Sequence, residues 1–306
     1  MSDSSTLNGR VIKSHGSRYI VLTAEGSFDC ALRGKFRHAQ KKEVNPVAVG
    51  DRVVITIEEA PYGSIEVIEE RANKLSRPDV IRPDWEQVLV ANCDQLVVVT
   101  AVMQPKFKYG AIDRFLLIAE KAGLDAAVVL NKIDLSAPES YERAVEVYRL
   151  AGYRTVTTSA LDGHGIEDLR RLVQLKTSIF AGHSGVGKSS LLNALEPGLG
   201  IRTQIVSAST DRGMHTTTYV ELHPLTFGGF IADMPGVRAI GLWDVQPESL
   251  PTLYREFRPY HGTCRFHNCL HIGEPNCAVR AAVDSGVIAP ERYEGYMRIR
   301  ESLQEE

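Results

Sequence analysis

The stretch that most restricts the fold is GHSGVGKS at residues 182–189, which fits the pattern G-x-x-x-x-G-K-[ST]. The apolar run TSIFAG precedes it and KSSLLNAL follows it, which predicts a strand, a glycine-rich loop and a helix in that order. The glycines let backbone N–H groups turn inward around phosphate oxygens, and the N-terminus of the helix adds positive potential. We therefore expect a phosphate-binding loop, with Lys188 reaching the outer phosphates and the Ser189 hydroxyl holding Mg²⁺.

A second motif, NKID, comes before the phosphate loop, at the end of the apolar run AAVVL. A carboxylate at Asp134 accepts two hydrogen bonds from the N1–H and exocyclic amine of guanine, a donor pair that adenine lacks. Lys132 can lay its methylene stem along the base, and Asn131 can tie this loop to the phosphate loop. Farther on, TSA at residues 158–160 can place the Ala160 N–H near the guanine carbonyl, so the two motifs together predict a guanine site.

Two further motifs follow the phosphate loop. In GMHTTT, residues 213–218, a threonine can give Mg²⁺ a second hydroxyl ligand, although the same residues also fit the start of an ordinary β-strand. In DMPG, Asp233 at a strand end can bind the metal through water, and Gly236 can offer its N–H to the γ-phosphate without steric hindrance. All five parts of a GTP site are therefore present, in the order base, base, phosphate, metal, γ-phosphate. This is a circular permutation of the usual order of GTPase motifs. Such a permutation preserves the three-dimensional site if the termini of the unpermuted domain lay close together.

The segments around these motifs predict the fold class. Residues 9–70 contain short β-rich runs broken by Gly and Pro, which fit a small barrel, with an OB-like barrel as one of several candidates. From about residue 94 strands and helices alternate, which is typical of a parallel sheet covered by helices on both faces. We expect a multidomain protein with an all-β OB-like barrel at residues 1–72, a circularly permuted α/β P-loop domain at 73–240 and a mainly helical metal-binding domain at 241–306.

Composition and charge exclude other classes of protein. The chain has 306 residues and a net charge of −3, so its overall charge does not indicate a nucleic-acid partner. The longest apolar runs are far too short to span a bilayer, and the N-terminal residues lack the apolar core of a signal peptide. We expect a cytoplasmic protein with no membrane partner, and we expect it to be a monomer.

One basic stretch, ALRGKFRHAQKK at residues 31–42, stands out within the barrel region. It contains no acidic residue and one aromatic, Phe36. A solvated surface loop is the simpler interpretation, and a contact for a phosphate backbone is the alternative. Its basic residues are Arg33, Lys35, Arg37, Lys41 and Lys42.

The motifs NKID, TSA, GHSGVGKSS, GMHTTT and DMPGVR, followed by a C-x4-C-x-H-x5-C cluster, occur in this order over most of the chain. In this the chain resembles the RsgA (YjeQ) family of bacterial circularly permuted GTPases, which act in late maturation of the small ribosomal subunit. The resemblance implies an N-terminal OB domain that binds RNA, a permuted GTPase domain and a C-terminal zinc domain. It also implies GTP and GDP as ligands, Mg²⁺ and one structural Zn²⁺ as cofactors, and the small ribosomal subunit and its rRNA as partners.

The resemblance assigns roles to individual residues. The family's switch threonine maps to Thr217, and Val237 stands where many GTPases place a glutamine that orients water. His215 is the family's candidate for that role, since imidazole can donate to or accept from water near neutral pH; the alternative is a polar switch residue without a catalytic role. The expected catalytic residues are His215, Thr217 and Lys188, and the expected magnesium ligands are Ser189, Thr217 and Asp233. The expected nucleotide-binding residues are Asn131, Lys132, Asp134, Ser159, Ala160, Gly182, His183, Ser184, Gly185, Val186, Gly187, Lys188, Ser189, Ser190 and Gly236.

The zinc ligands that the resemblance implies are Cys264, Cys269, His271 and Cys277. Three thiolates and one imidazole suit tetrahedral zinc, and a full ligand set without an open position favours a structural site. His267 lies in the same stretch, so it can replace one of these ligands. A redox-reactive cysteine group is the alternative to a metal site.

The motifs and the resemblance lead to a hypothesis of function. GTP and Mg²⁺ order the stretch 196–218 and the loop after Asp233, the flanking domains hold ribosomal RNA, and hydrolysis releases the protein from a matured subunit. The alternative is a GTP-dependent RNA-binding clamp in which hydrolysis only resets binding. NKID and TSA disfavour a P-loop ATPase or kinase, and the net acidity and single cysteine cluster disfavour a zinc-finger DNA-binding protein.

Overall fold

The computed structural model describes residues 6–33, 42–201, 220–234 and 242–305. His215, Thr217, Gly236 and Val237 lie outside the described residues, as does most of the basic stretch 31–42. The chain divides into two compact units. The first comprises Met1–Asp94, Val173–Ile179 and Ser207–Ile240, and the second comprises Gln95–Leu172, Phe180–Val206 and Gly241–Glu306.

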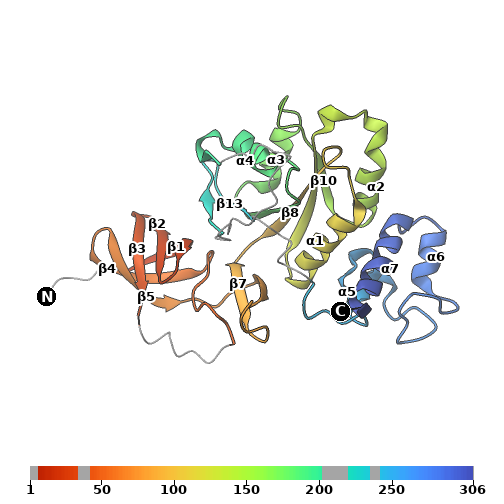
Figure 1. The fold of residues 1–306 in the computed structure, drawn as a ribbon, viewed down its shortest axis with the longest axis horizontal. Coiled ribbons are helices and arrows are strands. Elements are labelled where there is room, and N and C mark those ends of the chain that lie inside the picture. The colour runs from red at the N-terminus through yellow and green to blue at the C-terminus, as the bar shows by residue number, and fades with distance from the viewer. Residues whose placement is uncertain (1–5, 34–41, 202–219, 235–241, 306) are drawn as a thin grey trace. The chain divides into compact units, whose positions relative to one another are not determined.

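A closed barrel forms the N-terminal part of the first unit, as the β-rich runs predict (Figure 1). The barrel strands pair in the order β1-β2-β3-β5-β4; β3 and β5 are parallel, and the other neighbouring pairs are antiparallel. Val11, Val21, Ile55 and Ile65 are fully buried inside it, because alternate residues of a strand point to opposite faces. The strands are β1 (Thr6–His15), β2 (Arg18–Thr23), β3 (Gly26–Leu32), β4 (Arg52–Glu59) and β5 (Tyr62–Ile68).

An antiparallel pair of strands, which the sequence pattern did not predict, follows the barrel. It consists of β6 (Lys74–Pro78) and β7 (Glu86–Ala91). The end of β7 lies close to the barrel at Gly50, where an added Cβ would come 2.0 Å from the carbonyl oxygen of Ala91. Gly50 also has a φ of +91°, so only glycine lets the two backbones approach at this point without strain.

The P-loop domain contains a six-stranded sheet with the order β10-β9-β8-β11-β13-β12. Its strands β8, β9 and β10 are parallel, and β8 and β9 are almost entirely buried, as continuous apolar runs predict. The predicted alternation of strands and helices is confirmed. The strands are β8 (Gln95–Ala101), β9 (Asp125–Asn131), β10 (Arg154–Thr157), β11 (Thr177–Ala181), β12 (His223–Pro224) and β13 (Phe230–Asp233). The helices are α1 (Tyr109–Lys121), α2 (Glu142–Leu150), α3 (Ile166–Val173) and α4 (Lys188–Leu195).

The C-terminal region is mainly helical, as expected, and its longest helix, α7, lies beside α1 (Figure 1). Within the described ranges, none of the helices has the length and hydropathy that crossing a bilayer requires. The helical elements are α5 (Leu250–Leu253), the 3-10 segment η6 (Arg255–Tyr260), α6 (Ala278–Asp284) and α7 (Pro290–Glu305).

A buried charge cluster connects α7 to α1. The guanidinium of Arg292 on α7 forms ion pairs with Asp113 on α1 and with Glu256 in η6, and all three side chains are at most 4% exposed. The Tyr148 hydroxyl donates a further hydrogen bond of 3.2 Å to Asp113 Oδ1. Since a buried charge without its partner is strongly destabilising, these pairs hold the helical region against the P-loop domain.

Candidate functional site

The phosphate loop lies between β11 and α4, where the strand–loop–helix pattern predicts it. Gly182 and Gly187 both have positive φ, at +154° and +92°. A Cβ at Gly182 would come 2.2 Å from the carbonyl oxygen of Val99, and one at Gly187 would come 2.4 Å from Asn131 Nδ2. The loop therefore packs its backbone directly against β8 and against the NKID motif, at points where no side chain fits.

Asn131 joins the two motifs through one hydrogen bond. Its side chain is buried, and its Nδ2 donates to the carbonyl oxygen of Val186 in the phosphate loop over 2.9 Å. Thr158, which is also buried, donates its hydroxyl to Asn131 Oδ1 over 3.1 Å. The sequence motifs pointed to Ser159 and Ala160 of TSA but not to Thr158, whose hydroxyl holds the Asn131 amide. A hydroxyl beside a guanine-binding motif was the signal that could have identified it.

Lys132 makes a second connection to the phosphate loop. The residue has a left-handed backbone, with φ at +61°, and its Nζ donates to the carbonyl oxygens of Gly185 over 2.6 Å and of Gln104 over 2.5 Å. The side chain therefore extends over the loop with its ammonium group held by backbone carbonyls. The sequence did not point to Gln104, because every residue has a backbone carbonyl and the residue type does not indicate which carbonyl accepts a hydrogen bond.

Asp134 lies two residues after Lys132 in the NKID motif, and the TSA segment contacts the same motif from the end of the next strand. Asp134 belongs to a 3-10 turn, η2 (Ile133–Leu135), and its side chain is exposed. The TSA segment follows β10 and is paired with the end of β9, because the Thr158 N–H donates to Leu130 O over 2.8 Å. Ser159 is buried and Ala160 is half-buried. The structure thus brings NKID, TSA and the phosphate loop together within the second unit.

The remaining residues of the phosphate loop begin α4. Lys188 Nζ donates to the carbonyl oxygens of Gly182 and His183 over 2.9 and 3.3 Å, so its ammonium group lies across the loop. Ser189 is half-buried in the first turn of α4. His183 packs edge-to-face against Phe115 of α1, with the ring centroids 6.0 Å apart. Ser184 and Ser190 are exposed.

The expected magnesium and γ-phosphate residues are only partly described. Asp233 is the last residue of β13, at a strand end as expected. His215, Thr217 and Gly236 lie outside the part of the chain that the structure describes, so their roles stay predictions.

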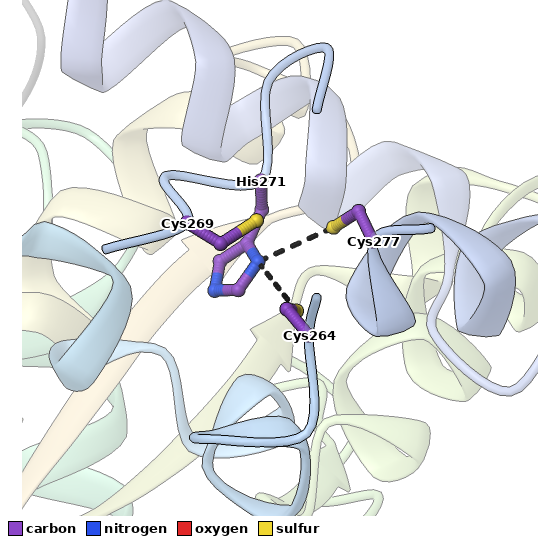
Figure 2. Close-up of side chains that lie close together, drawn as sticks. All are labelled: Cys264, Cys269, His271 and Cys277. Atoms are coloured by element: carbon purple, nitrogen blue, oxygen red, sulfur yellow. Dashed lines mark hydrogen bonds between the residues drawn. The ribbon is translucent and has the colours of Figure 1, made fainter. Parts of the chain in front are cut away.

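The four expected zinc ligands converge in the C-terminal region (Figure 2). Their ligand atoms all lie within 4.8 Å of one another, and His271 Nδ1 lies 3.3 Å from Cys277 Sγ and 3.6 Å from Cys264 Sγ. Tetrahedral zinc places sulfur and nitrogen ligands roughly 3.5 Å apart, so the three thiols and the imidazole fit that ion. His267 is exposed and is not among the four.

The surroundings favour the metal-binding form of two ligands, His271 and Cys264, whereas burial raises the pKa of the Cys269 and Cys277 thiols. Burial lowers the pKa of His271, which keeps the imidazole neutral and able to bind a metal. The Ala278 N–H points to Cys264 Sγ over 3.3 Å, a contact that stabilises a thiolate. The geometry therefore favours a structural zinc site over a redox-reactive cysteine group.

A phosphate loop joined to an NKID motif that precedes it in the chain, together with the barrel and the Cys3His cluster, defines a circularly permuted P-loop GTPase with flanking domains. A family model described as RsgA GTPase matches residues 68–243, and a model of the RsgA N-terminal domain matches residues 8–65. The chain therefore belongs to the RsgA GTPase family, and the resemblance read from its motifs is confirmed.

Known proteins resemble the chain over nearly its whole length. The small ribosomal subunit biogenesis GTPase RsgA of Gemmatimonas aurantiaca is 43% identical over 298 residues, which cover 96% of this chain and 97% of that protein. The crystal structure of YjeQ from Thermotoga maritima superposes with a TM-score of 0.82 at 37% identity, covering 98% of this chain and 99% of that one. The structure of YloQ, described as a circularly permuted GTPase, gives a TM-score of 0.77 at 32% identity, covering 98% and 96%.

Proposed function

We propose that this protein hydrolyses GTP to GDP and phosphate, that the small ribosomal subunit stimulates the reaction, and that the protein acts in late maturation of that subunit. The observation that carries the proposal is the direct connection between the guanine motif and the phosphate loop. Asn131 and Lys132 donate to consecutive carbonyl groups of that loop, those of Val186 and Gly185. Base recognition and triphosphate binding are thereby held in one rigid arrangement, despite the permuted order of the motifs.

The chemistry assigned to the site is positioning and charge stabilisation for an in-line attack by water. Asp134 would pair with the guanine edge, and Lys188 would turn from the loop carbonyls to the outer phosphates. Ser189, Thr217 and Asp233 would hold Mg²⁺, which would stabilise the charge on the phosphates. Val237 has no side-chain hydrogen-bonding group, which fits slow turnover by the protein alone. We assign the orientation of water to His215, whose imidazole can donate or accept.

The proposed ribosomal role comes from the relatives' names and from the flanking regions. Relatives that match along 96% or more of this chain are small ribosomal subunit biogenesis GTPases. We assign the contacts with ribosomal RNA to the barrel at residues 1–72 and to the zinc domain at 241–306, with the GTPase domain at 73–240 between them. A factor that acts on ribosomal subunits works in the cytoplasm, and we place this protein there.

The charge available for RNA on the barrel is reduced by ion pairs. Of the basic stretch 31–42, Arg33 forms an ion pair with Glu66 over 2.7 Å, and Lys42 contacts Asp84 over 3.4 Å. The Lys42–Asp84 pair is exposed and contributes little to stability, and Arg33 is exposed although Glu66 is half-buried, so a phosphate backbone can replace either acidic partner. The stretch therefore stays a candidate RNA contact, alongside its interpretation as a solvated loop.

The experiment that tests the proposal is GTP hydrolysis by the purified protein alone, with small ribosomal subunits, and with large subunits as a control. We expect strong stimulation by the small subunit and none by the large subunit. No stimulation would leave the GTP site standing but would contradict the ribosomal role. Tight GTP-dependent binding to the small subunit without faster turnover would instead support an RNA-binding clamp in which hydrolysis only resets binding.

The Lys188→Ala variant tests the site within the same assay. Removal of the ammonium group that reaches the outer phosphates is expected to abolish nucleotide binding or turnover. Arg171→Ala is the matched control, because it removes an exposed cation of α3 that, within the described part of the chain, forms an ion pair with Asp168 on the same helix. If Lys188→Ala kept full subunit-stimulated hydrolysis, the assignment of the phosphate loop would be wrong.

A further inference from the structure

The loop that carries Cys269 and His271 closes around a neighbouring carboxylate, that of Glu274. Glu274 Oε1 accepts a hydrogen bond of 2.8 Å from the Leu270 N–H. Its Oε2 accepts two more, of 2.8 Å from the Ile272 N–H and 3.1 Å from the Gly273 N–H. Both carboxylate oxygens are thus used by the backbone of the loop that presents two of the four zinc ligands.

The carbonyl groups of the same loop are held from α7. The Tyr293 hydroxyl donates to the carbonyl oxygen of His271 over 2.7 Å, and the Tyr296 hydroxyl donates to that of Leu270 over 2.5 Å. Glu274 therefore accepts from N–H groups on both sides of His271, those of Leu270, Ile272 and Gly273, and α7 holds the carbonyls of Leu270 and His271. Satisfied polar groups of this kind fix a backbone conformation more strongly than packing alone.

This conformation needs such support, because it is unfavourable in itself. His271 has a left-handed backbone with φ at +61°, which is unfavourable for a residue other than glycine because its Cβ crowds the following carbonyl. The left-handed turn directs the imidazole to Cys264 and Cys277, as Figure 2 shows. If the loop relaxed to an ordinary conformation, His271 would move away from both cysteines.

We propose that Glu274 is a positioning residue that preorganises the Cys269–His271 loop for zinc, without being a ligand itself. Glu274 is not among the residues whose ligand atoms converge at the site. This role depends on zinc binding by Cys264, Cys269, His271 and Cys277, as part of the zinc domain in the proposed function. Outer groups that orient metal ligands characteristically change metal affinity by about 10- to 100-fold when they are removed.

The state of the Glu274 carboxylate fits this role. Partial burial disfavours the charged form, but the backbone N–H donors outweigh burial and lower the pKa of Glu274 to about 2. An ionised carboxylate accepts stronger hydrogen bonds from N–H groups than a neutral amide does. Replacement by glutamine keeps the size of the side chain but leaves one acceptor oxygen for three donors, so it removes the function with little change in shape.

The test compares the zinc affinity of purified full-length wild-type protein, Glu274→Gln and Glu294→Gln, measured by competition with a chromophoric chelator. Glu294→Gln is the matched control, because it removes an exposed carboxylate of α7. We expect Glu274→Gln to bind zinc at least about tenfold more weakly than the other two proteins, which bind one ion equally. Equal zinc affinity of Glu274→Gln and wild type would overturn the proposal.

The absorption spectrum of bound Co²⁺ separates a positioning role from direct ligation. With saturating Co²⁺ we expect the same tetrahedral thiolate bands in Glu274→Gln as in wild type, because all four ligands remain. A changed band pattern would overturn the proposal by identifying Glu274 as a ligand. If wild-type protein bound neither metal, the zinc assignment itself would fail, which is a different result from equal affinities.

A second variant keeps the proposal testable if Glu274→Gln does not fold. Tyr293→Phe removes only the hydroxyl, which donates to the carbonyls of His271 and, over 3.3 Å, Ile272, at nearly constant volume. We expect a smaller, several-fold loss of zinc affinity, because two of the three backbone anchors of the loop remain. Unchanged affinity would contradict the view that this backbone must be held in place for zinc.

Discussion

Asp134 shows how a single carboxylate can select the base. The side chain is exposed in the turn after β9, beside a motif whose other polar residues are already held by the phosphate loop. Its acceptors are therefore available to a ligand that offers two adjacent donors, as guanine does. Asn131 and Lys132 hold the loop, and we propose that Asp134 binds the guanine edge.

The Asp134→Asn variant is expected to change base specificity. An amide presents one acceptor and one donor, which mismatches guanine but matches xanthine, where a carbonyl replaces the exocyclic amine. GTP affinity should fall by at least about tenfold, since each hydrogen bond to a charged group contributes roughly 1.5–3 kcal/mol. Binding of fluorescent GTP and xanthosine triphosphate analogues measures both changes. If GTP bound equally well to the variant, the guanine assignment would be contradicted.

Helices α1 and α7 show why intrinsic helix propensity alone does not predict the effect of a glycine on stability. Gly295 lies within α7, where glycine normally weakens a helix by about 1 kcal/mol relative to alanine. Here an added Cβ would lie 2.2 Å from Asp113 Oδ2, inside the buried cluster formed with Arg292. The glycine allows the two helices to come close enough for their charges to pair.

The Gly295→Ala variant is therefore expected to destabilise the protein by about 1–3 kcal/mol, since overpacking displaces the buried carboxylate. Gly110→Ala is the matched control: Gly110 lies in α1, and an added Cβ would meet nothing within 4 Å. That variant should be neutral or more stable by up to about 1 kcal/mol. Denaturant unfolding measures both free energies. Equal effects of the two variants would show that the contact with Asp113 does not limit the packing of α7.

The chain as a whole combines a barrel, a P-loop domain and a helical region. Among the described residues, the helical region contacts α1 through α7 and through ion pairs of Arg255 and Arg258 with Glu120. Metal binding to a site that does not exist in the unfolded chain adds its free energy to folding. The proposed zinc ion should thus contribute to the stability of the region that packs on α1.

Removal of zinc by a chelator is expected to lower the melting temperature of the protein. An ion that binds only the folded cluster raises the free energy of unfolding, so its removal lowers that free energy. Scanning calorimetry of the full chain before and after chelation measures the change, and re-addition of Zn²⁺ should restore the original value, whereas Mg²⁺ should not. An unchanged midpoint in protein shown to be free of zinc would refute a structural role for the ion.

The sequence by itself determined the phosphate loop, the guanine motif, their permuted order and the presence of a cysteine and histidine cluster, whereas the structure decided between His271 and His267. Each of these depends on residue types at short spacings, because phosphate, base and metal require particular groups in a fixed local order. It also determined the succession of a β-rich region, an alternating region and a helical region, since periodicity reports which face of each element is buried.

Only the tertiary structure decided which distant or backbone groups hold these parts in place. Arg292 and Asp113 are 179 residues apart, and nothing in the local pattern around either of them specifies the other. Lys132 uses the carbonyl of Gln104, and Glu274 uses three N–H groups whose direction depends on a left-handed turn at His271. Backbone donors and acceptors are present at nearly every position, so only the folded chain determines which of them meet a given side chain.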